Sequence, residues 1–243
     1  METEQLKTLW HLAFGDSYDF IDLFFSTAYA PGRCRFLAEA GRLTAALYWL
    51  DCEYQGQKLA YIYAVATHPY HRGRGLCRKL MADTHNALKQ QGYAGALLMP
   101  AEAGLRKMYA NMGYRNCTRV SEFSCTAGTP VPLRKICPEE FAWLRRKYLP
   151  ENGVIQEGDS IAYLASYSDF YAGADFLLAG TPQGAQFHGI ELLGNRDAAP
   201  GILAALGCEA GSFRCPGGEI PFAMFLPLAD TVEVPGYLGL AFD

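Results

Sequence analysis

The amino-acid sequence predicts a mixed α/β (α+β) fold, with a mixed twisted sheet flanked by helices. Strand-like runs alternate with amphipathic helical segments along the chain. Half of the 243 residues are hydrophobic, which is enough to bury a substantial core. The pattern of elements starts again after the segment Thr-Ala-Gly-Thr-Pro at 126–130. We therefore expect two domains, over residues 1–128 and 129–243.

The first half is expected to begin with two short helices within 6–28, separated at Gly15 and Asp16. Asp16 is the expected N-cap of the second helix. Residues 61–66 carry no charge on either face, so we expect the strand over 58–67 to be central and covered on both sides. The other elements expected here are strands over 33–54 with a turn at Gly41, a hairpin turn at Gln55-Gly56, a helix from Leu76 to the C′ residue Gly92, a strand over 94–99, a helix over 102–112 and a last strand over 116–125.

The second half repeats the order of elements but not the residues, which suggests an internal duplication. Its expected elements are a strand over 131–136, a helix over 138–148, a helix over 159–170, strands over 176–179 and 189–193, a helix over 198–206, and strands over 222–228 and 237–242.

Composition and charge exclude several classes of protein. The net charge of −4 leaves no dominant basic face, which argues against nucleic-acid binding. The eight cysteines form no C-x-x-C pair and no cluster with zinc spacing, so we expect no metal site; His68 and His71 are three apart but have no further ligand nearby. No segment approaches 18 apolar residues, and the first residues do not resemble a signal peptide. We expect a cytoplasmic protein without a membrane partner.

A basic, glycine-containing loop stands between an expected strand and an expected helix. It reads Arg72-Gly73-Arg74-Gly75-Leu76-Cys77. The first N–H groups of a helix lack intrahelical partners and attract anions, and glycines let an oxyanion approach the backbone. Two arginines add positive charge. The loop is thus a candidate phosphate site, and the alternative is a solvated basic turn before a surface helix.

A second motif, Tyr109-Ala110-Asn111-Met112-Gly113-Tyr114, follows one strand later. Together the two motifs resemble those of the GNAT family of N-acetyltransferases, namely the loop R/Q-x-x-G-x-G/A and a later Y-x-x-x-G-F/Y. The resemblance covers about residues 1–125. The runs RGRGLCRKLM and AEAGLRKMYANMGY, with the second half as a degenerate GNAT-like domain, resemble most the "enhanced intracellular survival" acetyltransferases of mycobacteria.

The resemblance implies the GNAT acyl-CoA N-acyltransferase fold, with two central parallel strands that splay apart. The pantetheine arm of acetyl-CoA, the co-substrate, would lie along Val65, Ala66 and Thr67. Its pyrophosphate would sit on Arg72, Gly73, Arg74, Gly75, Leu76 and Cys77. Tyr109 would be the general acid for transfer of the acetyl group to the amine of a small molecule or peptide. Periodicity fits a core tyrosine at position 109 equally well.

The sequence departs from the family pattern at several positions. Cys77 replaces the final glycine or alanine of the loop, Glu102 replaces an asparagine, and the family's first strand is missing, so the second half is a candidate to complete the sheet. The strand over 58–67 holds no carboxylate, which leaves water, Asp16, Glu102 or the terminal carboxylate of Asp243 as the base. The terminal carboxylate of Asp243 is a candidate by analogy with the mycobacterial acetyltransferases named above. Two alternatives stay open: a non-catalytic acyl-CoA-binding or regulatory module, and transfer of a longer acyl group.

Overall fold

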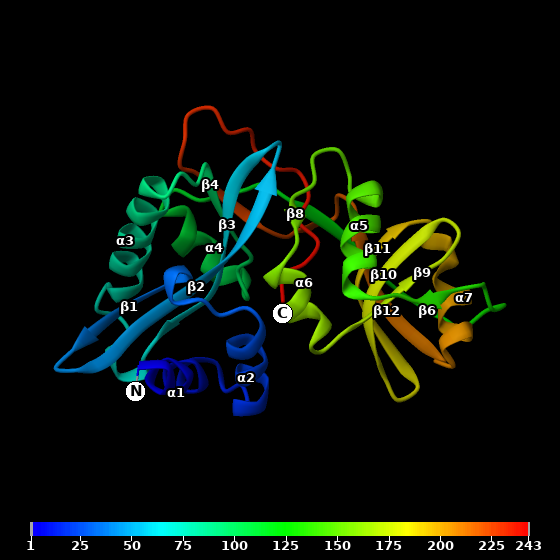
Figure 1. The fold of residues 1–243 in the computed structure, drawn as a ribbon, viewed down its shortest axis with the longest axis horizontal. Helices are drawn as coiled ribbons and strands as arrows, with labels where there is room; N and C mark the ends of the chain where they lie inside the picture. Colours follow the sequence, from blue (N-terminus) through cyan, green and yellow to red (C-terminus); the bar gives the residue numbers. More distant parts are fainter. Residues whose placement is uncertain (1, 243) are drawn as a thin grey trace. The chain divides into compact units, whose positions relative to one another are not determined.

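The computed structural model describes residues 2–242, in two compact units that are each discontinuous in sequence (Figure 1). The first unit is Met1–Arg115 with Met224–Val234, and the second is Asn116–Ala223 with Pro235–Asp243. Each contains a mixed sheet with helices packed on it, which confirms the predicted α/β fold. The predicted division of the chain at residue 128 concerns two GNAT-like halves, and it stays a prediction.

The first unit follows the expected order of elements, and its sheet has the order β1-β2-β3-β4-β14-β5. Its elements are α1 (Glu2–Phe14), α2 (Tyr18–Thr27), η1 (Pro31–Arg33), β1 (Cys34–Glu39), β2 (Arg42–Tyr54), β3 (Gln57–Thr67), η2 (Pro69–His71), α3 (Leu76–Gln90), β4 (Gly95–Leu98), α4 (Ala103–Ala110), β5 (Arg115–Asn116) and β14 (Met224–Pro227). The turn at Gln55 and Gly56 is confirmed, with φ of 50° and 73°.

Two adjacent residues of β2 show how helices cover both faces of the first sheet. The Tyr48 ring lies 5.4 Å from that of Trp10 in α1 and 5.2 Å from that of Phe24 in α2, measured between ring centroids. Trp49 points the other way, into a core that includes Leu80 of α3. The long β2–β3 hairpin therefore lies between two helical layers, and the predicted central position of β3 is confirmed (Figure 1).

The N-cap of α2 is Ser17, and the prediction of Asp16 is wrong. The Ser17 hydroxyl accepts a hydrogen bond from the Phe20 N–H at 3.2 Å. The Asp16 carboxylate instead accepts from the indole N–H of Trp10 at 2.7 Å. Its acceptor oxygen is thus used to fix the turn between α1 and α2.

The last strands of the two halves are exchanged relative to the prediction. The segment expected to end the first sheet runs from Arg119 to Thr126 as β6, and it pairs antiparallel with β12 in the second sheet. Strand β14 takes the edge of β4, with Met224 opposite Leu98. The second half does complete the first sheet, and Gly95 makes this possible because the Phe225 ring lies where a side chain at position 95 would be.

The second unit has the sheet order β13-β6-β12-β11-β10-β9-β7, and α7 packs against the core of this sheet. Its elements are β6, β7 (Arg134–Lys135), α5 (Pro138–Tyr148), β8 (Ile155–Gln156), α6 (Asp159–Ala165), β9 (Asp169–Ala172), β10 (Phe176–Gln183), β11 (Gln186–Gly194), η3 (Arg196–Ala198), α7 (Ala199–Leu206), β12 (Ala210–Pro216) and β13 (Ile220–Pro221). The strand expected over 131–136 is short, the helix expected over 159–170 ends early, and β12 was not predicted.

The C-terminal segment is buried as expected, but the strand predicted over 237–242 is wrong. Val154 N–H donates to the Tyr237 carbonyl at 2.9 Å, and the segment then leaves the strand geometry. The Gln156 side chain binds both the carbonyl and the N–H of Leu240, at 2.6 and 3.3 Å. A side-chain amide thus replaces the ladder of a neighbouring strand. Asp243 lies outside the described residues, so its predicted role as a base stays a prediction.

Candidate active site

Strands β3 and β4 run parallel over a short stretch only. Their ladder joins Leu59–Tyr61 to Gly95–Leu97, whereas β3 continues to Thr67. Ala64 has a φ of 46°, and the register between β3 and β2 shifts at the same place. A bulge of this kind bends a strand. The predicted segment of Val65, Ala66 and Thr67 therefore lies beyond the part of β3 that β4 pairs with.

The glycines of the loop leave open space at the start of α3. Gly73 and Gly75 have φ of 77° and 76°, and Gly75 is the N-cap without a side-chain cap. A Cβ atom at either position would meet no atom within 4 Å. The first N–H groups of α3 are thus open to an anion, and the left-handed backbone explains why glycine stands at both positions.

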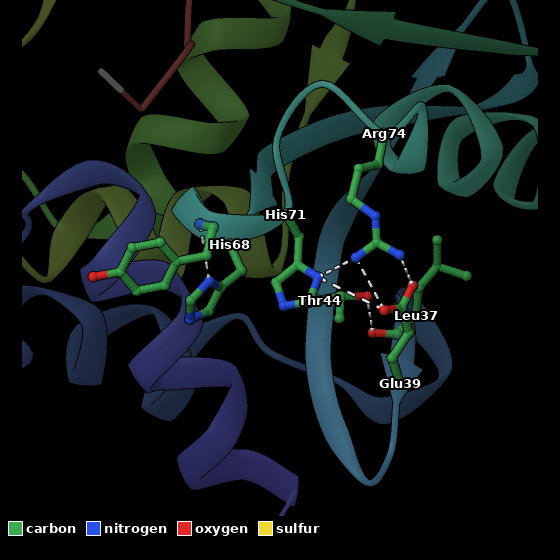
Figure 2. Close-up of polar contacts among 7 residues, drawn as sticks. Leu37, Glu39, Thr44, His68, His71 and Arg74 are labelled. Carbon is green, nitrogen blue, oxygen red and sulfur yellow. Dashed lines mark hydrogen bonds and ion pairs between the residues drawn. The ribbon is translucent and has the colours of Figure 1, made fainter.

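Both arginines of the loop contact other parts of the first unit. Arg72 donates to the Ala13 carbonyl at 3.1 Å and to the Thr67 carbonyl at 3.4 Å. Arg74 binds Glu39 of β1 with both terminal nitrogens, at 2.9 and 3.1 Å (Figure 2). Sequence reasoning assigned both charges to phosphate and found neither of these contacts.

A cavity of about 530 Å³ joins the end of β3, the loop and α4. Its lining includes eight of the residues predicted for the coenzyme or for catalysis, which are Val65, Thr67, Arg72, Gly73, Gly75, Leu76, Cys77 and, from α4, Tyr109. Ala66 is buried and, like Arg74, is not part of the lining. The residues that were not predicted for it are Ala13, Phe14, His71, Arg78, Leu105, Met108 and Met112. Of these, only Leu105, Met108 and Met112 could be anticipated from the sequence, because they belong to the apolar stripe of the expected helix.

Tyr109 combines burial with access to the cavity. The residue is 7% exposed, and its ring packs at 6.0 Å between centroids against that of Tyr114. Burial raises the pKa of Tyr109 above its ordinary value. The hydroxyl therefore keeps its proton at neutral pH.

Residues 1–117 match the family model described as an acetyltransferase (GNAT) domain. They form a GNAT acetyltransferase domain. The predicted family is confirmed, and the domain is that of an acyltransferase.

Solved structures share the fold of the chain that carries this GNAT domain. A GCN5-related N-acetyltransferase from Kribbella flavida is 16% identical with a TM-score of 0.69, over 92% of this chain and 68% of that one. Eis1 from Mycobacterium abscessus is 14% identical with a TM-score of 0.66, over 93% and 70%. A tandem GNAT protein from the clavulanic acid biosynthesis pathway is 12% identical with a TM-score of 0.56, over 94% and 95%. No curated protein sequence matches the chain.

Three other titratable side chains of the GNAT domain, those of Cys77, Glu102 and Asp16, differ in burial and in their contacts. Burial raises the pKa of Cys77, so this side chain is a thiol and not a thiolate nucleophile. Glu102 is exposed at the N-cap of α4 and does not line the cavity. Asp16 is bound to Trp10. Two of the carboxylates considered as a base from the sequence, Asp16 and Glu102, are thus absent from the cavity lining.

The histidines next to the loop bind protein groups. His68 accepts a hydrogen bond from the Tyr70 N–H at 3.3 Å, and His71 Nδ1 lies 2.6 Å from Arg74 Nη1 (Figure 2). Residues 2–242 contain no group of three or more His, Cys, Asp or Glu side chains placed to hold a metal ion.

Over the same residues, no helix has the length and apolar character needed to cross a bilayer.

Proposed function

We propose that the GNAT domain binds acetyl-CoA and transfers its acetyl group to a primary amine of a small molecule or peptide. One observation carries the proposal: a single cavity connects the end of a diverging strand, the open N-terminus of α3 and the buried hydroxyl of Tyr109. These three features match the three parts of an acyl-CoA, which are its amide-containing arm, its pyrophosphate and its thioester.

The residues of the cavity fit such a ligand. Val65 and Thr67 line the cavity beyond the part of β3 that pairs with β4, where the amides of the arm would lie along the strand. The α3 N-terminus with Gly73 and Gly75 offers N–H groups for the pyrophosphate. Leu105, Met108 and Met112 provide apolar wall for the arm.

In this proposal the amine attacks the thioester directly, and the protein assists the proton transfers that accompany the attack. An alkylamine is mostly protonated at pH 7, with on the order of one molecule in a thousand neutral. Water or the terminal carboxylate of Asp243 removes the proton. The amine nitrogen then bonds to the thioester carbonyl carbon while the carbon–sulfur bond breaks, and Tyr109 protonates the departing sulfur. The nitrogen loses its second proton as the amide forms, and this proton returns through water to the Tyr109 oxygen.

The test is release of free thiol from acetyl-CoA by the purified protein across a panel of polyamines, aminoglycosides, amino acids and peptides. We expect amine-dependent release with at least one acceptor class, and an N-acetylated product by mass spectrometry. Propionyl-CoA in parallel tests the longer acyl donor. Binding of coenzyme A without turnover on any amine would support the non-catalytic module instead.

Gly75→Glu is expected to weaken coenzyme A binding by about tenfold or more, the loss that follows from one charge-assisted hydrogen bond. The new carboxylate would stand at the N-cap, where the phosphate is proposed to bind. Gly92→Glu is the matched control, because Gly92 has a φ of 79° at the other end of α3 and the same open surroundings. Calorimetry on both variants measures the effect. Equal affinities in folded proteins would contradict the phosphate site.

Deletion of Asp243 is expected to lower turnover and to change its pH dependence over pH 6–9, because the terminal carboxylate would move by one residue. The preceding residues Leu240, Ala241 and Phe242 are buried, so a shortened tail cannot simply slide to restore the position. Rates with a saturating amine measure the effect. Full activity of the deletion at every pH would rule out the terminal base.

The second unit is proposed to shape the acceptor side or to support the fold, without binding coenzyme A. Strands β11 and β12 are parallel and α7 follows β11, as in the first unit. The segment before α7 is Asn195-Arg196-Asp197-Ala198, which contains no glycine, and Pro200 stands in the first turn.

The proposed cellular location is the cytoplasm. All eight cysteines are free thiols, which suits a reducing compartment.

A further inference from the structure

Arg74 lies in the phosphate loop, yet a carboxylate from another strand binds its guanidinium. Glu39, the last residue of β1, accepts from both terminal nitrogens of Arg74, and His71 Nδ1 is 2.6 Å from one of them (Figure 2). A guanidinium that holds two carboxylate oxygens presents the same pair of donors that binds two phosphate oxygens. Glu39 thus occupies the position on Arg74 that a phosphate would take.

The Arg74–Glu39 pair is exposed enough to be exchanged. The two side chains are 49% and 43% exposed, and ion pairs in such settings contribute little to stability because water and salt screen them. A phosphate carries at least as much charge as a carboxylate, and it would also be held by the N-terminus of α3. Arg74 follows Gly73 and precedes Gly75, so its backbone belongs to the segment that would hold the phosphate.

We propose that Glu39 competes with a phosphate of the bound acyl-CoA for Arg74, so that Arg74 exchanges one oxyanion for the other when the coenzyme binds. The inference rests on the proposed binding of acyl-CoA to this loop. Glu39 neutralises Arg74 in the free protein, which weakens the attraction of the loop for anions. It is therefore a residue that sets the affinity of the site for the coenzyme.

The test is calorimetry with coenzyme A, 3′-dephospho-coenzyme A and pantetheine on the full chain. Glu39→Gln is expected to tighten coenzyme A binding by about two- to fivefold, the range of an exposed ion pair. The gain should be absent for pantetheine, and absent when Arg74→Gln is also present. A gain that persists with the dephospho ligand assigns the pyrophosphate as the competitor, and a gain that is lost with it assigns the 3′-phosphate.

Glu140→Gln is the matched control, because Glu140 forms a similar bidentate pair with Arg134 in the second unit and the change in net charge is the same. It should leave the affinity unchanged. Unchanged or weaker binding by Glu39→Gln would overturn the exchange, since Glu39 would then only position Arg74. An equal gain with and without Arg74 would overturn it too, as an effect of charge alone. Absence of coenzyme A binding to the unaltered protein would instead contradict the proposed function.

Discussion

Tyr109→Phe is expected to lower kcat for acetyl transfer by about 10²–10⁴-fold, the usual contribution of a general acid. Phenylalanine keeps the packing against Tyr114 and in the cavity wall, so the affinity for acetyl-CoA should change little. Because burial raises the pKa of Tyr109, this acid stays protonated over pH 6–9 and should cause no loss of kcat at the alkaline end. Single-turnover rates and calorimetry measure the two effects separately.

Tyr114→Phe is the control for removal of a buried tyrosine hydroxyl. Tyr114 is 1% exposed and is not part of the cavity lining, and its hydroxyl lies 2.9 Å from His85 Nε2. Its loss should affect stability more than turnover. If Tyr109→Phe turns over within twofold of the unaltered protein while chemistry limits the rate, Tyr109 is a core residue and the acid must be sought elsewhere.

Arg145→Met is expected to destabilise the second unit by about 3–5 kcal/mol, the cost of leaving a buried charge without its partner. Arg145 and Glu191 are 2% and 1% exposed, and the guanidinium contacts both carboxylate oxygens, at 2.7 and 2.9 Å. Methionine fills similar space but leaves the Glu191 carboxylate with the Tyr237 hydroxyl, which donates to it at 3.0 Å. Thermal unfolding should show a Tm lower by on the order of 10 °C.

The double variant Arg145→Met with Glu191→Met separates the charge from the packing. Removing both charges also removes the desolvation cost of the pair, so most of the lost stability should return. Tyr237→Phe gives the cost of one hydrogen bond to the carboxylate, which is about 1.5–3 kcal/mol for a charged partner. A double variant as unstable as the sum of the single ones would show that the pair contributes through its shape and not through its charge.

The local chemistry of the site could be predicted from the sequence because it depends on residues close together in the chain. Gly73 and Gly75 mark a backbone that other residues rarely adopt, and both have positive φ in the structure. The spacing of Leu105, Met108, Tyr109 and Met112 places them on one helical face, and all four line the cavity. Five of the six predicted loop residues, all except Arg74, lie with Tyr109 around one cavity, although the loop and α4 are separate segments of the sequence.

Only the tertiary structure decided which strands pair and which charges are already bound. The segments 119–126 and 224–227 are strand-like by composition, but their places in the two sheets depend on competition among distant edges, which no local pattern encodes. In the sequence Arg74 is a candidate phosphate ligand with no visible partner. In the structure its guanidinium binds Glu39 of β1, which lies 35 residues earlier in the chain. The C-terminal segment was predicted as a strand because it is apolar. In the structure the backbone of Leu240 is hydrogen-bonded to the Gln156 side chain and not to a neighbouring strand. Such contacts depend on the energy of the whole arrangement, and hydrophobic periodicity reports only which face of a segment is buried.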